Sequence, residues 1–368
     1  MPQVPEVAAI ECSIGYRRRH QPEEATLIRV DVGTFSPPVV LDLAASSGHL
    51  DAAGLEVTEH PVPSSPAQFR SLVDGDLQVA LTSPDNVLAY RLLPANPLGR
   101  TADVRILLGV DRGLGLALYA RPGLGRAAGP EPAAGSEPAA GPARAVGARP
   151  VPPAGPGGGI QAVRGGTVGV DVAESGFAFA LYEVLAMAGL RRDADYRVVE
   201  LGSTPRRLDA LLAGDCDATM LNAGSDLRAA AAGCRRLARA VDACRPYLGT
   251  VLAATGAACE QPDNQLDALV TALRTVLRGL GPGSGPQLRE VAERAVAGLG
   301  FGPADARAYV ARLADPAEGL VLDGEPDPAA LVGVQRLRQR HTRLAGLDPD
   351  DLTAVPAGLV DRRFLAGR

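Results

Sequence analysis

Residues 64–86, SSPAQFRSLVDGDLQVALTSPDN, and residues 203–226, STPRRLDALLAGDCDATMLNAGSD, share one pattern. In each segment a hydroxyl residue precedes a proline, leucines follow, and a Gly-Asp pair leads into a short apolar run. A hydroxyl residue before proline is typical of a helix start, and glycine is typical of a helix end. Both segments therefore predict a capped helix followed by a buried strand.

The sequence that precedes each segment repeats in the same order. LIRVDVG at 27–33 and GGTVGVDV at 165–172 read as buried strands, because both are rich in β-branched residues. A predicted helix follows each of them, and then a second strand, LEVTEH at 55–60 or YRVVELG at 196–202. One such unit would be a generic αβ pattern. Two in the same order predict an α/β protein with two similar lobes, each a mainly parallel sheet flanked by helices.

The C-terminal third of the chain has a different pattern. From about residue 264 it is helical, with an apolar face on 266–280 and further helical stretches at 286–300, 303–315 and 327–347. These stretches have no strands of their own. We therefore expect them to be extra C-terminal helices on lobe 1, with GLVDRRFL at 358–365 as a final docking segment.

Residues 123–159 are almost entirely Gly, Ala and Pro. Such a composition cannot bury enough apolar surface to fold. The entropy cost of closing a loop grows only slowly with its length, so a lobe tolerates a long insertion on its surface. We predict a disordered insert within the second lobe.

The composition argues against nucleic-acid binding and against a membrane span. Hydrophobic residues make up 46% of the 368 residues and charged residues 21%, as in a folded protein. The formal net charge is -5, and aromatic residues are only 4%. A nucleic-acid binder needs a basic patch or aromatic stacking platforms. No run approaches the roughly 18 apolar residues of a membrane span.

The N-terminus and the cysteines bear on the compartment. The basic cluster at 17–19 is followed by polar residues where a signal peptide has an apolar core, and a glutamate directly before Cys12 does not suit a lipoprotein site. We expect a cytoplasmic chain, or a cell-surface or extracytoplasmic one if it has another start or export route. The five cysteines form no CxxC pair, so we predict no metal site and no cofactor, and pairing of Cys234 with Cys244 stays open.

Five segments carry a resemblance to a known family. They are LIRVDVGTFSPPVVLDLAASSGHLDAAGLEV, SSPAQFRSLVDGDLQVALTS, GIQAVRGGTVGVDVAESG, LLAGDCDATML and GLVDRRFL. In this order they resemble ABC-transporter substrate-binding proteins of the nitrate, sulfonate and taurine type, and the related thiamine-pyrimidine-synthase group. The chain departs from that family in lacking an export signal, in having His49 where an aromatic residue is common, and in its insert.

The resemblance implies a type II periplasmic-binding-protein fold and a solute-binding function with an ABC permease as partner. Its two crossover strands would lie near Gly109 to Leu118 and Tyr247 to Ala254. The implied organisation has a tail and two lobes, with lobe 1 built from two parts of the chain. The boundaries are 1–25 for the tail, 26–112 for the first part of lobe 1, 113–246 for lobe 2, and 247–368 for the return to lobe 1.

Candidate ligand-binding residues follow the predicted strands. In open α/β sheets ligands lie beyond the carboxyl ends of the strands. Most residues there are small and carry hydroxyl groups, which together with helix N-termini can hold a sulfonate or carboxylate, whereas Phe35 and Phe177 suit a heteroaromatic body. Each could instead cap a helix or shape a turn. The candidates are Thr34, Phe35, Ser36, Ser64, Ser65, Thr82, Ser83, Arg112, Ser175, Gly176, Phe177, Asn222 and Asp226.

A cytoplasmic enzyme or sensor of the same fold is the alternative. Thiamine-pyrimidine synthases carry a cysteine-rich segment that this chain lacks, and desulfinases of this fold use a cysteine where this chain has Thr34 to Ser36. An enzyme of the menaquinone-pathway type stays open, because its catalysis depends less on a legible motif. We expect a monomer that closes on a small molecule without turnover, with no catalytic residue, and the sequence leaves the ligand's identity open.

Overall fold

The computed structural model describes residues 27–36, 38–125, 159–261, 265–281, 286–298, 300–343 and 354–366. The predicted N-terminal tail, residues 1–25, and most of the predicted insert lie outside the described residues.

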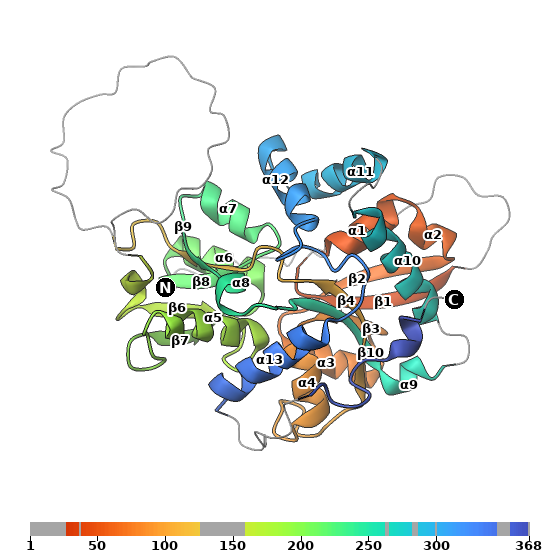
Figure 1. Cartoon of the computed structure of the whole chain (residues 1–368), viewed down its shortest axis with the longest axis horizontal. Helices are drawn as coiled ribbons and strands as arrows, with labels where there is room; N and C mark the ends of the chain where they lie inside the picture. The colour runs from red at the N-terminus through yellow and green to blue at the C-terminus, as the bar shows by residue number, and fades with distance from the viewer. Residues whose placement is uncertain are drawn as a thin grey trace, which may run out of the picture.

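Two five-stranded sheets, A and B, form the centres of two lobes (Figure 1). The strand order is β2-β1-β3-β10-β4 in sheet A and β7-β6-β8-β5-β9 in sheet B. The first three strands of each order are parallel, and β10 and β5 run antiparallel to both of their neighbours. The matching orders confirm the two similar α/β lobes that the repeat predicts. The strands are β1 (Ile28–Thr34), β2 (Leu55–Pro61), β3 (Val79–Thr82), β4 (Val104–Asp111), β5 (Ala117–Ala120), β6 (Thr167–Val170), β7 (Arg197–Glu200), β8 (Ala218–Leu221), β9 (Arg235–Arg239) and β10 (Thr250–Thr255).

The described chain crosses between the sheets twice. Residues 112–116 link β4 of sheet A to β5 of sheet B, and residues 240–249 link β9 back to β10. Each crossover delivers the antiparallel strand of the other sheet. A pair of short crossovers is the usual structural basis of a hinge between two lobes.

Capping residues fix the helices that flank the sheets. Ser64 accepts a hydrogen bond from the amide of Ala67, and Gly75 ends the same helix in the left-handed region, at a φ of 88°. The second copy of the pattern ends in the same way at Gly214, with a φ of 85°. The capped helices therefore form where the sequence predicts them. In these two copies and around them the helices are α1 (Val39–Ser46), α2 (His49–Ala52), α3 (Ser65–Asp74), α4 (Pro84–Leu92), α5 (Gly176–Met187), α6 (Thr204–Ala213), α7 (Ser225–Ala231), α8 (Ala240–Ala243) and α9 (Gly256–Cys259), with a 3-10 turn at Ile160–Val163.

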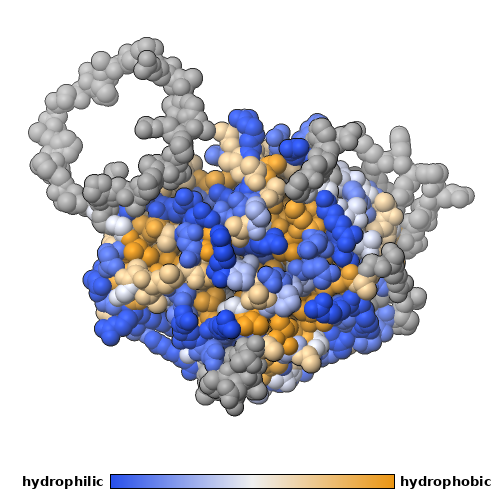
Figure 2. Space-filling model, in the orientation of Figure 1, coloured by the Kyte–Doolittle hydropathy of each residue, from blue (hydrophilic) through white to orange (hydrophobic). Residues whose placement is uncertain are grey.

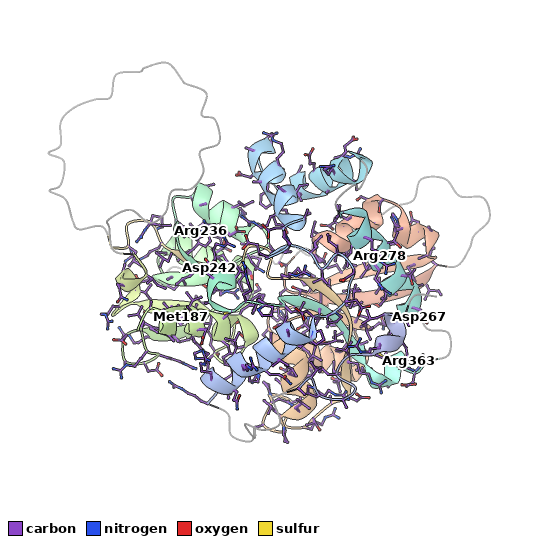
Figure 3. The ribbon with its side chains drawn as sticks, in the orientation of Figure 1. Met187, Arg236, Asp242, Asp267, Arg278 and Arg363 are labelled. Carbon is purple, nitrogen blue, oxygen red and sulfur yellow. The ribbon has the colours of Figure 1, made fainter. Side chains whose placement is uncertain are left out.

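Most C-terminal elements pack on lobe 1. Helix α10 (Gln265–Gly279) buries Leu269 and Leu273 in the core around sheet A, while Asp267 and Arg278 lie on its outer side (Figure 3). Helices α11 (Pro286–Ala297) and α12 (Pro303–Leu313) pack on each other, and α11 packs on α1. The segment that contains the 3-10 turn Arg362–Phe364 returns to β4.

Helix α13 (Pro328–His341) differs from the other C-terminal helices. It packs on α4 of lobe 1 and also on α5 of lobe 2, so it lies across both lobes (Figure 1). The expectation that the C-terminal helices pack on lobe 1 therefore describes only one side of α13. Its apolar face fits that expectation, but the charged residues near its end find partners on lobe 2.

The viewed surface is mixed in character. Figure 2 shows apolar areas on both lobes, separated by bands of hydrophilic residues. Within the described ranges, no helix has the length and hydropathy needed to cross a membrane.

Candidate ligand-binding site

A cavity lies between the lobes, at the carboxyl ends of the parallel strands. Its walls enclose about 870 Å³, including the space open to solvent. Nine of the predicted residues line it: Thr34, Phe35, Ser36, Thr82, Ser83, Ser175, Gly176, Phe177 and Asn222.

Several helices begin at this cavity. Residues at the starts of α1 and α4 line it from lobe 1, and residues at the starts of α5 and α6 line it from lobe 2. The first amides of a helix have no partner within the helix, and the helix dipole makes this end positive. Converging helix starts therefore favour an acidic group on a ligand.

Many hydroxyl groups at the cavity already have partners in the protein. Thr34 donates to Glu59 Oε1 at 2.6 Å, and Ser175 donates to Asp171 Oδ1 at 2.5 Å. Ser175 also caps α5 by accepting from the amide of Ala178 at 3.2 Å. Ser203 precedes α6 and makes no cap hydrogen bond with its side chain. Residues that cap helices thus also line the cavity, as the sequence pattern allowed.

Arg207 lines the cavity and was not among the residues predicted from the sequence. It extends from α6 and is only 2% exposed. Burial lowers the pKa of its guanidinium, although arginine stays charged at neutral pH. The matched helices place Arg207 at the position of Gln68 in lobe 1, which the structure also buries.

Two carboxyl groups line the same cavity. Asp111, at the end of β4, is 3% exposed, and burial raises its pKa to about 6. Hydrogen bonds from Thr250 and from the amide of Gly113 act in the opposite direction. Asp171 follows β6 in lobe 2 and accepts the hydrogen bond from Ser175.

Apolar side chains also line the cavity. They include Phe35 and Val39 of lobe 1, Leu114 of the first crossover and Tyr309 of α12. Tyr309 is 1% exposed and is contributed by the C-terminal helices. No local sequence pattern marks Tyr309 as a cavity residue, since only the packing of α12 brings it to the cavity.

Four predicted residues lie away from this cavity. Ser64 caps α3, and Ser65 lies beside a separate hollow near Tyr90. Arg112 instead donates to the carbonyl of Leu320 at 2.6 Å. The first crossover starts beside Leu320, because Leu320 forms an isolated β-bridge with Asp111. Asp226 is 1% exposed and pairs with Arg312 of α12 at 2.5 Å, so it joins lobe 2 to α12.

Among the described residues, no cysteine lines the cavity. Cys216, Cys234, Cys244 and Cys259 are buried and form no disulfide bond, so Cys234 and Cys244 are not linked to each other in this structure. Across the described ranges, no group of three or more His, Cys, Asp and Glu residues is arranged to hold a metal ion.

The lobes touch each other around the cavity. A methyl group added to Gly176 of lobe 2 would lie 2.5 Å from Ser83 Oγ and 2.7 Å from Asp85 Cβ of lobe 1. One added to Gly202 would lie 3.2 Å from the carbonyl oxygen of Pro63. The structure is therefore a closed form, in which glycines allow the close approach of the two lobes.

Known structures share this fold, although no protein-family profile and no curated protein matches the sequence. A protein from Bordetella bronchiseptica superposes with a TM-score of 0.65 at 16% identity, over 92% of this chain and 95% of that one. The alkanesulfonate-binding protein SsuA from Xanthomonas axonopodis pv. citri, bound to MOPS, gives 0.59 at 14% identity, over 87% and 96%.

The periplasmic nitrate-binding protein NrtA from Synechocystis PCC 6803 gives a TM-score of 0.56 at 11% identity, over 76% of this chain and 69% of that one. These similarities establish the two-lobed fold of periplasmic binding proteins, as the sequence resemblance implied.

Proposed function

We propose that the protein binds a small organic solute between its lobes, as the substrate-binding component of an ABC importer. The observation that carries this proposal is a cavity whose walls are shared by both lobes, with helix N-termini from each lobe beginning at it. A ligand held by both lobes stabilises the closed form by its differential contacts. The fold neighbours that bind an alkanesulfonate or nitrate support an acidic solute.

The domain boundaries and the compartment belong to the same proposal. Lobe 1 comprises residues 26–112 and 247–368, and lobe 2 comprises residues 113–246, with the chain passing between them at the two crossovers. The protein would work as a monomer beside its permease. An importer takes up its solute from outside the membrane, so this function favours the extracytoplasmic expectation over the cytoplasmic one.

Binding without turnover is the form of the proposal that the cavity supports best. No His or Cys occurs among the described residues that line it, and Ser175 is engaged in a helix cap. The usual base that activates a serine nucleophile is a histidine, and the neighbour of Ser175 is instead the carboxylate of Asp171. The cavity lining thus favours recognition of a solute over covalent chemistry.

The proposal is tested by ligand-dependent stability. Purified protein is screened by thermal shift against alkanesulfonates, carboxylates, pyrimidines and nitrate. A ligand at 100 times its Kd stabilises the folded state by about 2.7 kcal/mol. Small-angle scattering of the same samples should show the radius of gyration falling when the ligand binds.

Ser203→Trp is the matching variant. Ser203 lines the cavity and is only partly buried, so an indole there fills the site without removing a cap hydrogen bond. We expect it to abolish the thermal shift, whereas Ser46→Trp, at the exposed end of α1, should leave the shift unchanged. Consumption of the ligand by the wild type, or binding without compaction, would favour the enzyme alternative.

A further inference from the structure

Lobe 2 buries a positive charge that makes no hydrogen bond to a carboxylate within the described part of the chain. The carboxylate of Asp171, which lines the same cavity, acts on the Arg207 guanidinium only through space. The nitrogens of Arg207 donate to the carbonyl of Gly202 at 2.7 Å, to Thr204 Oγ1 at 3.0 Å and to the carbonyl of Met220 at 3.4 Å. All of these acceptors are neutral. A guanidinium has five N–H groups, and the four hydrogen bonds leave one of them for another acceptor.

Other buried arginines of this protein lie close to a carboxylate. Arg338 is 3% exposed and makes two hydrogen bonds to the carboxylate of Asp85, at 2.7 and 2.8 Å. Arg274 is 8% exposed and lies 3.8 Å from Glu325 Oε1, and the partly buried Arg312 pairs with Asp226. Burying an uncompensated charge is costly, so an arginine away from any function is expected to have such a partner. Arg207 instead borders the cavity.

The fold itself does not require a charge at this position. In lobe 1 the matching residue, Gln68, donates through its amide to the carbonyls of Gly33 and Leu81, at 2.9 and 3.1 Å. Leu81 in β3 corresponds to Met220 in β8, so Gln68 and Arg207 bind equivalent strands in the two lobes. A neutral amide meets the structural need in one lobe, and a guanidinium occupies the position in the other.

The surroundings of Arg207 define what would neutralise it. The starts of α5 and α6 add the positive ends of two helices on the same side of the cavity. Asp171 and Asp111 also line the cavity, so a second negative charge on the ligand would be repelled. On the lobe 1 side the wall is apolar around Phe35 and Val39.

We infer that Arg207 is the counter-charge for the acidic group of the ligand, and that the ligand is a monoanionic sulfonate or carboxylate. Its acidic group lies in lobe 2, against Arg207 and the starts of α5 and α6, and its apolar body lies against lobe 1. This inference rests on the proposed function, and it adds the residue that meets the acidic group, the single charge of the ligand and the ligand's orientation.

The test uses Arg207→Gln, which places in lobe 2 the residue that lobe 1 already has. The probes are butanesulfonate, butyrate and the neutral butyl methyl sulfone, measured by calorimetry. A hydrogen bond to a charged group contributes about 1.5–3 kcal/mol, so we expect affinity for both anions to fall roughly 10- to 100-fold. Affinity for the sulfone should stay the same. Arg206→Gln, one position earlier on the exposed side of α6, should change neither.

The unliganded protein gives a second readout. If Arg207 awaits an anion, Arg207→Gln removes a buried charge that has no hydrogen-bonded carboxylate, and the melting temperature without ligand should stay equal or rise. If Arg207 is only structural, that melting temperature should fall, and the affinity for sulfone and sulfonate should fall together. The latter result would overturn the inference and leave the proposed function standing.

The charge of the ligand is tested with butyl phosphate. It is mostly a dianion at neutral pH, because the second pKa of a phosphate ester is about 6. We expect it to bind more weakly than butanesulfonate, and equal or tighter binding would contradict a monoanionic ligand. A wild type that binds and closes on the sulfone, but on neither monoanion, would overturn the inference alone. Failure to bind or close on any solute in the full screen would instead remove the proposed function.

Discussion

At the residue scale, several polar groups of the cavity are already held by hydrogen bonds within the protein. Thr34 and Ser175 donate to carboxylates, and Thr82 accepts from the amide of Asn86 at 3.0 Å. These bonds fix the side chains before a ligand arrives, which lowers the ordering cost of binding. Asp111 has a pKa of about 6, so its charge changes close to neutral pH.

Asp111→Asn should stabilise the protein at neutral pH. The folded-state pKa of about 6 lies above the ordinary value of 3.8, so the folded form binds the proton more tightly. Stability is therefore highest below pH 3.8 as far as this group is concerned, and it declines as the pH rises towards 6. This pKa shift corresponds to a loss of roughly 2–3 kcal/mol of folding stability above about pH 6, and Asp111→Asn should remove that loss. Urea unfolding at several pH values measures it.

Asp361→Asn provides the control of opposite sign. Hydrogen bonds from Arg363 and Arg105 hold the pKa of Asp361 at about 2. The ionised Asp361 stabilises the fold fully above the ordinary pKa of 3.8, and this stabilisation is lost as the pH falls towards 2. Asp361→Asn should therefore lose stability at neutral pH. If Asp111→Asn instead destabilised the protein at neutral pH, the ionised carboxylate would be needed by the fold.

The sequence located strand ends better than it located side-chain roles. Residues after β1, β3, β6 and β8 reach the cavity, because the carboxyl ends of parallel strands meet at one edge. Arg207 and Tyr309 were missed for different reasons. Arg207 sits in an ordinary amphipathic helix pattern, where a charged residue reads as exposed, and Tyr309 reaches the cavity only through the packing of a helix distant in sequence.

At the element scale, α13 joins the two lobes through its last two turns. Arg338 binds Asp85 of α4 and also donates to the carbonyl of Glu174 in lobe 2 at 3.1 Å. Close to it, His341 Nε2 lies 2.7 Å from Glu183 Oε2 of α5. The helix thus holds the closed form by contacts that an open form would have to give up or carry along.

Arg338→Met should be strongly destabilising. It leaves Asp85, which is fully buried, without its partner, and breaking a buried ion pair in this way costs about 3–5 kcal/mol. The double variant Asp85→Asn with Arg338→Met should lose less than the sum of the two single variants. Denaturant unfolding measures all three.

An exposed ion pair supplies the comparison. Arg294 and Glu290 of α11 lie 3.6 Å apart and are 70% and 67% exposed. Arg294→Met should change stability by less than about 0.5 kcal/mol. If Arg294→Met and Arg338→Met lowered the free energy of unfolding equally, the Arg338–Asp85 pair would not be buried in solution.

Capping patterns explain why most helices could be predicted and why their partners could not. The cap at Asp327 and the proline after it mark the start of α13 from local sequence alone. Its contacts with α4 and α5 join residues more than 150 positions apart, such as Arg338 and Glu174. Local sequence carries no information on such contacts, so the position of α13 across both lobes could not be read from it.

At the scale of the whole molecule, the duplication is visible in the sequence and the closure is not. The repeated order of elements predicts two lobes, because each copy forms its own sheet. Closure depends on small residues at the starts of lobe 2 helices. Gly176 and Gly202 meet lobe 1, and Gly224 lies against Phe301. A glycine before a helix reads equally well as a turn residue, so these contacts leave no separate mark in the sequence.

Gly176→Ala should therefore open the protein while leaving each lobe folded. The φ of Gly176 lies outside the left-handed region, so alanine suits the backbone and the start of α5. The clash with Ser83 Oγ could be relieved by rotation, but Asp85 Cβ, 2.7 Å from the added methyl group, is fixed to the backbone of α4. We expect a larger radius of gyration in small-angle scattering, and ligand affinity roughly tenfold weaker or more, because fewer molecules are in the closed form. Gly302→Ala, whose added methyl group would meet only Asp305 Oδ2 at 3.9 Å, should leave both quantities at their wild-type values. An unchanged radius of gyration and affinity in Gly176→Ala would mean that α4 and α5 do not meet in solution, and that the lobes close by a different contact.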